Sequence, residues 1–221
     1  MADSETLRFE DTTPDAPSIR GYLHIPARAS GDGMVLTHGA GANCNAPLLV
    51  ALADAFCEAG FTVLRCDLPF RQLKPKGPPS RGSAEKDQLG LRRAVEAMRR
   101  RNLGRVFLGG HSYGGRQASI LAASEDGLVD GLLLLSYLLH PPKRPAELRT
   151  AHFPSLRTQA LFVHGSRDAF GTIEEMAIAL QPVLARIELM VVQNAGHELM
   201  SAGNRDTLPE AIVKAFKKYF R

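Results

Sequence analysis

Six short, unbroken apolar runs recur along this chain, and each is followed by a tight-turn or polar sequence. They are MVLTH (34–38), FTVLRC (61–66), RVFLGG (105–110), GLLLLS (131–136), ALFVHG (160–165) and IELMVV (187–192). Runs of this length that are rich in leucine and β-branched residues are typical of strands buried on both faces of a parallel sheet. They therefore predict a sheet that is covered by helices on both sides.

Helical sequence fills most of the intervals between these runs. We expect helices over residues 47–59, 83–101, 113–124, 173–184 and 208–220. The segments 6–10 and 19–25 alternate loosely, which predicts an antiparallel pair at the start of the chain. Strand and helix then alternate to the end, so the predicted class is α/β, with a doubly wound, mostly parallel sheet flanked by helices. We predict a single domain over residues 1–221.

Two connections differ from the others. Leu68–Gly82 contains four prolines and four basic residues, which predicts a polar and mobile loop. Leu138–Gln159 has room for a short helix but is too short to form a cap domain over the sheet.

Charge and cysteine content exclude several classes of function. The formal net charge is +4, and Arg65–Arg105 holds twelve basic and four acidic residues. No nucleic-acid recognition motif accompanies this stretch, so we expect solvated surface charge and no nucleic-acid partner. The alternative is an anionic substrate, attracted by the basic residues of the 71–81 loop, which are Arg71, Lys74, Lys76 and Arg81.

The three cysteines, Cys44, Cys57 and Cys66, lack the spacing of a zinc site or a disulfide framework, so we expect inert thiols and no metal. The start, MADSETLRFE, has no charged region followed by an apolar stretch and is not typical of a secretory signal. The longest apolar run is too short to span a bilayer. We therefore expect a cytoplasmic protein with no membrane partner. The sequence leaves its oligomeric state open.

The most specific motif is Gly110-His111-Ser112-Tyr113-Gly114-Gly115. It follows a predicted strand and opens a predicted helix, as the G-x-S-x-G nucleophile elbow requires. The glycines allow a turn in which side chains on either side of the serine would collide. Ser112 is the candidate nucleophile.

A serine hydroxyl needs a base, and the base needs an orienting carboxylate. In this type of fold they follow the serine in the order Asp or Glu, then His. Asp168 follows the ALFVHG run and His197 follows the IELMVV run, so order and position both match. Asp67 and Glu198 are competing acids without the expected order, and His140 is a further histidine with a position near the site.

The segment His38-Gly39-Ala40-Gly41 follows the first parallel strand, where an oxyanion-hole donor belongs. Its small residues allow the backbone to approach a substrate carbonyl. We assign the two donors to the backbone N–H groups of Ala40 and Tyr113.

The motifs HGAG, GHSYGG, GSRD and AGH together resemble the α/β-hydrolase superfamily, over nearly the whole chain. The segments LTHGAGANCNAPLL, LRCDLPF and GLLLLSYLLHPP resemble more narrowly the group of small, dienelactone-hydrolase-like enzymes that contains testis-expressed protein 30. That group also includes a subunit of a nuclear histone-acetyltransferase complex. The resemblance implies an eight-stranded hydrolase sheet without a cap domain and a triad of Ser112, Asp168 and His197.

The sequence thus predicts a serine hydrolase that cleaves a carboxylic ester, a thioester or a related acyl bond of a small molecule through an acyl-enzyme. No metal or organic cofactor is required for this chemistry. One alternative, suggested by the eukaryotic relatives, is a non-catalytic protein–protein scaffold with the hydrolase fold. A second alternative is a peptidase, although the chain shows no gating domain.

Overall fold

The computed structural model describes residues 4–221, and one eight-stranded sheet forms its centre. The strands are β1 (Glu5–Asp11), β2 (Ile19–Ile25), β3 (Gly33–Thr37), β4 (Thr62–Cys66), β5 (Val106–His111), β6 (Gly131–Leu135), β7 (Ala160–Gly165) and β8 (Ile187–Val192). Their spatial order is β1-β2-β4-β3-β5-β6-β7-β8. The β1–β2 and β2–β4 pairs are antiparallel and all other pairs are parallel, which confirms the predicted α/β class and the opening antiparallel pair.

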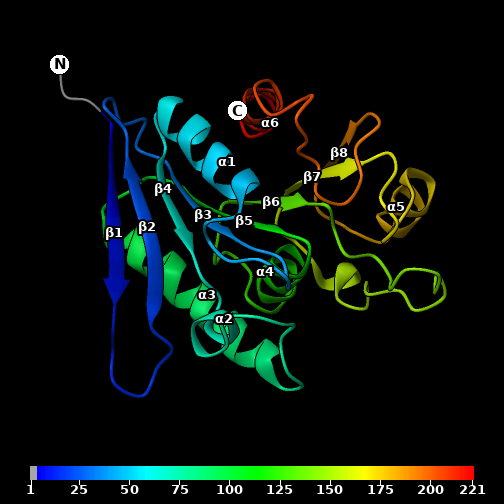
Figure 1. Ribbon diagram of the computed structural model, residues 1–221, viewed down its shortest axis with the longest axis horizontal. Coiled ribbons are helices and arrows are strands. Elements are labelled where there is room, and N and C mark those ends of the chain that lie inside the picture. Colours follow the sequence, from blue (N-terminus) through cyan, green and yellow to red (C-terminus); the bar gives the residue numbers. More distant parts are fainter. Residues whose placement is uncertain (1–3) are drawn as a thin grey trace.

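Helices cover both faces of this sheet (Figure 1). The pair α1 (Pro47–Glu58) and α6 (Leu208–Tyr219) lies on one face, and the pair α3 (Ser83–Arg99) and α4 (Tyr113–Ser124) lies on the other. Successive residues of a strand point to opposite faces. Leu132 and Leu134 of β6 accordingly join the core under α3 and α4, whereas their neighbours on the strand join the core under α1 and α6.

Two helices differ from the sequence prediction. Helix α5 (Ile173–Ala179) ends before residue 184, because Pro182 has no N–H for the helical ladder and disfavours helical backbone in the residue before it. Helix α2 (Pro69–Leu73) was not predicted. It begins with a proline at its first turn and buries Phe70 and Arg71, so the expectation of a polar loop from Leu68 onward is wrong for these residues.

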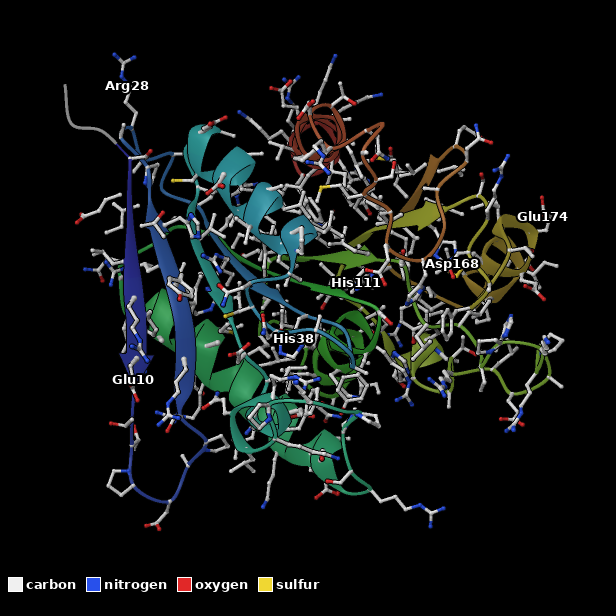
Figure 2. The ribbon with its side chains drawn as sticks, viewed as in Figure 1. Glu10, Arg28, His38, His111, Asp168 and Glu174 are labelled. Carbon is white, nitrogen blue, oxygen red and sulfur yellow. The ribbon has the colours of Figure 1, made fainter. Side chains whose placement is uncertain are left out.

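The connection between β6 and β7 contains only η1, a three-residue 3₁₀ turn (Phe153–Ser155), so the described residues form no cap domain, as predicted. None of the helices between residues 4 and 221 is long and apolar enough to cross a bilayer. The carboxyl ends of the parallel strands meet at one edge of the sheet, where ligand sites lie in open α/β sheets. Figure 2 shows His38, His111 and Asp168 along this edge, at the ends of or just after β3, β5 and β7.

Candidate active site

Ser112 lies between β5 and α4 in a backbone conformation that is rare for an L-amino acid, with φ 52° and ψ −114°. Such a conformation persists only where the surrounding structure imposes it. Here the glycines do so: a Cβ on Gly110 would lie 2.5 Å from the nitrogen of Gly115, and one on Gly114 would lie 2.5 Å from the carbonyl oxygen of His38. The motif therefore folds into a turn that only glycine permits at these positions.

His197 connects Ser112 to Asp168. Its Nε2 atom lies 2.8 Å from the Oγ atom of Ser112, and its Nδ1 atom lies 2.9 Å and 3.1 Å from the two carboxylate oxygens of Asp168. A carboxylate only accepts, so Nδ1 carries the hydrogen and Nε2 accepts from the serine hydroxyl. The structure thus brings together three predicted residues that are far apart in the sequence.

Asp168 is buried, and its carboxylate also accepts a hydrogen bond of 2.8 Å from the N–H of Phe170. Burial alone would raise the pKa of this carboxyl group. The hydrogen bonds from His197 and from the Phe170 N–H outweigh burial, and the pKa is lowered. Asp168 is therefore ionised at neutral pH and holds the hydrogen of His197 on Nδ1.

Two side chains that the sequence analysis did not assign to the site contact His197. His111 donates from Nε2 to the carbonyl oxygen of His197 at 2.9 Å, and burial lowers the pKa of this histidine. The ring of Phe170 lies 4.2 Å from the imidazole of His197, centre to centre. The only sequence signal for either was its place within two residues of Ser112 or Asp168.

Two of the competing candidates, Asp67 and His140, have other hydrogen-bond partners. One carboxylate oxygen of Asp67 accepts a hydrogen bond of 2.6 Å from the N–H of Cys44. The ring nitrogens of His140 bond to the carboxylate of Glu175 at 3.2 Å and to the carbonyl of Pro141 at 2.8 Å. Within residues 4–221 no group of three His, Cys, Asp or Glu side chains is arranged to hold a metal ion.

The turn Gly39–Ala42 lies beside the serine. It is closed by a hydrogen bond of 3.1 Å from the N–H of Ala42 to the carbonyl of Gly39, and a Cβ on Gly39 would lie 3.4 Å from the Cβ of Ser112. Tyr113 begins α4, so its N–H has no acceptor within the helix. Among the hydrogen bonds of the described residues, none is donated by the backbone N–H of Ala40 or Tyr113. Both groups can therefore donate to a ligand oxygen.

A family model described as an alpha/beta hydrolase domain matches residues 31–219. The chain belongs to the α/β-hydrolase family. As a member of that family it is a hydrolase, and the resemblance that its sequence motifs indicated is confirmed at this level. The narrower resemblance to the group of testis-expressed protein 30 stays a prediction.

Solved structures of similar fold include three bacterial proteins. One is the dienelactone hydrolase from Anabaena variabilis, with 20% identity, full coverage of both chains and a TM-score of 0.76. Another is Est1E from Butyrivibrio proteoclasticus, with 15% identity, 96% of this chain and 98% of that chain covered, and a TM-score of 0.76. The third is XC6422 from Xanthomonas campestris, described as a serine hydrolase without a lid, with 16% identity, 99% and 96% coverage and a TM-score of 0.75. At these identities the likeness shows that this hydrolase shares the fold of the three proteins.

The basic 71–81 loop of the hydrolase divides into two parts. Lys74, Lys76 and Arg81 are exposed, in agreement with solvated charge. Arg71 is buried and donates only to backbone carbonyls. The alternative, in which the basic residues attract an anionic substrate, is therefore wrong for Arg71 and stays a prediction for Lys74, Lys76 and Arg81.

Proposed function

We propose that this hydrolase cleaves a carboxylic ester, a thioester or a related acyl bond through an acyl-enzyme formed on Ser112. The observation that carries the proposal is the continuous set of hydrogen bonds from Ser112 through His197 to Asp168, which begins at a strained serine. A serine held in this way, with a base on its hydroxyl and an anion behind the base, is equipped for nucleophilic attack.

In the proposed mechanism His197 removes the proton of the Ser112 hydroxyl as Oγ attacks the substrate carbonyl. The N–H groups of Ala40 and Tyr113 donate to the oxyanion of the tetrahedral intermediate. The intermediate collapses to the acyl-enzyme, and His197 gives its proton to the leaving group. Water, activated by the same imidazole, then attacks the acyl-enzyme, and Ser112 regains its proton as the acid product leaves.

The proposed substrate is a small molecule with a short acyl group. A 3₁₀ turn is the only regular structure between β6 and β7, so this connection forms no cap under which a long alkyl chain could be buried. Each CH₂ of the acyl group that is left in water adds nothing to the binding free energy, whereas each buried CH₂ adds roughly 0.8 kcal/mol. For p-nitrophenyl esters from acetate to palmitate, kcat/KM is expected to rise over the first few carbons and then to level off. A steady rise to the longest esters would contradict an open site.

The main test is covalent labelling with a fluorophosphonate probe at neutral pH. We expect one label per chain on the peptide that contains Ser112, and no label on Ser112→Ala. Ser119→Ala is the matched control, because Ser119 is another buried serine on α4 that lies outside the triad. It should label like the wild type. A folded wild-type protein that neither labels nor hydrolyses any of these esters would reject the proposal and favour the scaffold reading of the fold.

A further inference from the structure

Arg71 is among the most buried charged side chains of the hydrolase, at 5% exposure. Its guanidinium group binds the turn Gly39–Ala42 through two hydrogen bonds. Nε donates to the carbonyl of Ala42 at 2.7 Å, and Nη2 donates to the carbonyl of Ala40 at 2.6 Å. The same side chain therefore holds two peptide groups of the segment that carries the Ala40 N–H.

The remaining hydrogen bonds of Arg71 fix the guanidinium itself. Nη1 donates to the carbonyl of Lys74 at 3.0 Å, and Nη2 donates to the carbonyl of Gly77 at 3.0 Å. All four acceptors of this side chain are backbone carbonyls and none is a carboxylate. Arg71 thus has no anionic partner among its hydrogen-bond acceptors. Its positive charge is stabilised by these peptide dipoles and by the ring of Phe70, whose centre lies 4.9 Å from the guanidinium carbon.

The Ala40 N–H belongs to the peptide group that joins Gly39 to Ala40, and hydrogen bonds hold this group as well. The carbonyl of the group, which is that of Gly39, accepts from the N–H of Ala42 and, at 2.8 Å, from Nδ1 of His38. His38 can donate there because its Nε2 atom accepts from the N–H of Leu68 at 3.1 Å. In a trans peptide the N–H points opposite to the C=O, so these bonds direct the Ala40 N–H away from the turn. Arg71 holds the next carbonyl, that of Ala40.

We propose that Arg71 is a positioning residue of the oxyanion hole. Its guanidinium locks the turn Gly39–Ala42 in the orientation that directs the Ala40 N–H toward the oxyanion, and its charge adds to the positive potential behind that donor. Arg71 does not touch the substrate. The inference rests on the proposed function and adds the element that keeps one donor organised before the reaction begins.

This role makes a specific kinetic prediction. The oxyanion exists only in the transition state and the intermediate, so a loss of its stabilisation lowers kcat and leaves KM nearly unchanged. A ligand for a substrate anion would behave differently, because its loss would raise KM for an anionic ester more than for a neutral one. A purely structural arginine would alter the melting temperature and leave both constants of the folded protein unchanged.

The test uses Arg71→Met and Arg71→Lys with p-nitrophenyl acetate and with its anionic counterpart, p-nitrophenyl hydrogen succinate. For Arg71→Met we expect kcat to fall roughly 10²-fold for both esters, similar to the loss of one oxyanion donor, with KM within about threefold of the wild type. Affinity for a trifluoromethyl ketone, which forms a tetrahedral adduct, should fall in parallel with kcat/KM. Arg71→Lys keeps the charge and should lower kcat about tenfold, because one ammonium group cannot make all the hydrogen bonds of the planar guanidinium.

Arg93→Met is the matched control. Arg93 is a buried arginine of α3 that donates to the carbonyl of Pro17 and to Asp11 and Thr13, far along the chain from the turn Gly39–Ala42. It should lower the melting temperature and keep kcat. If Arg71→Met does not fold, Arg71→Lys carries the test with the same split between kcat and KM. Folded Arg71 variants with wild-type kcat, beside an active wild type, would overturn the inference and leave the proposed function intact.

Discussion

Asp168 takes no proton in the proposed mechanism, yet the orientation and tautomer of His197 depend on its carboxylate. In Asp168→Asn the amide can donate to the ring and favour the tautomer with the hydrogen on Nε2, which cannot accept from Ser112. We expect kcat to fall about 10⁴-fold with p-nitrophenyl acetate at neutral pH. Asp67→Asn is the control, because the Asp67 carboxylate bonds to the N–H of Cys44 and not to His197. The kcat of this variant should stay within about tenfold of the wild type. Equal losses in the two variants would contradict the assignment of the acid.

The same scale shows what sequence can and cannot reveal about a site. Ser112, Asp168 and His197 were predicted because each follows an apolar run, and the ends of parallel strands meet at one edge of the sheet. Arg71 was assigned to a solvated loop because prolines and other basic residues surround it. Its carbonyl partners come from segments that only tertiary folding brings together, and no local pattern indicates such acceptors.

At the scale of elements, the elbow between β5 and α4 depends on close backbone contact. A Cβ on Gly110 would meet the backbone of Gly114 and Gly115 at 2.5 to 2.6 Å, and backbone cannot move aside as a flexible side chain can. We expect Gly110→Ala to lower the free energy of unfolding by about 1–3 kcal/mol, which is typical of overpacking. It should also slow fluorophosphonate labelling, because a shifted turn misplaces Ser112.

Gly41→Ala is the control for this prediction. A Cβ on Gly41 would have no atom within 4 Å, although the residue lies in a turn next to the site. Its free energy of unfolding in urea should therefore stay within about 0.5 kcal/mol of the wild type. If Gly110→Ala were as stable as Gly41→Ala, the tight packing of the elbow would not be a constraint on the sequence.

Strands were predicted more accurately than the short helix for a physical reason. Burial on both faces demands a continuous apolar run, and such a run is visible in a single sequence. A helix of five residues, such as α2, cannot show a period and is not stable by itself. It forms because Phe70 and Arg71 are buried and because the Phe70 N–H donates to the buried carboxylate of Asp87 at 3.0 Å.

On the scale of the whole molecule, burial of neutral histidines links stability to pH. Burial is the largest cause of a lowered pKa at five histidines, namely His24, His38, His111, His152 and His164. For His152 burial and the neighbouring charge of Arg116 lower the pKa to about 4. The carboxyl group of Asp168 has a lowered pKa, so the stability that its ionised form contributes is lost only in stronger acid.

The sign follows from which state binds protons. An unfolded histidine takes up a proton near pH 6.5, whereas folded His152 stays neutral down to about pH 4. The unfolded chain therefore binds more protons in this window, and the free energy of unfolding falls as the pH falls from about 6.5 toward 4. His152 alone accounts for a loss of up to about 3 kcal/mol at 1.36 kcal/mol per pKa unit. Stability should be greatest above about pH 6.5.

Two substitutions of similar size separate this effect from general acid lability. His152→Gln removes the buried titrating group, so its free energy of unfolding should fall less than that of the wild type between about pH 7 and pH 4.5 in urea. His140→Gln should behave in the opposite way: its free energy of unfolding should fall more than that of the wild type over the same pH range. Burial opposes the charge of His140, but the Pro141 carbonyl and Glu175 outweigh it and raise the pKa, so charged His140 adds stability that is present below about pH 6.5 and is lost as the pH rises. Parallel pH curves for the two variants and the wild type would show that neither histidine contributes.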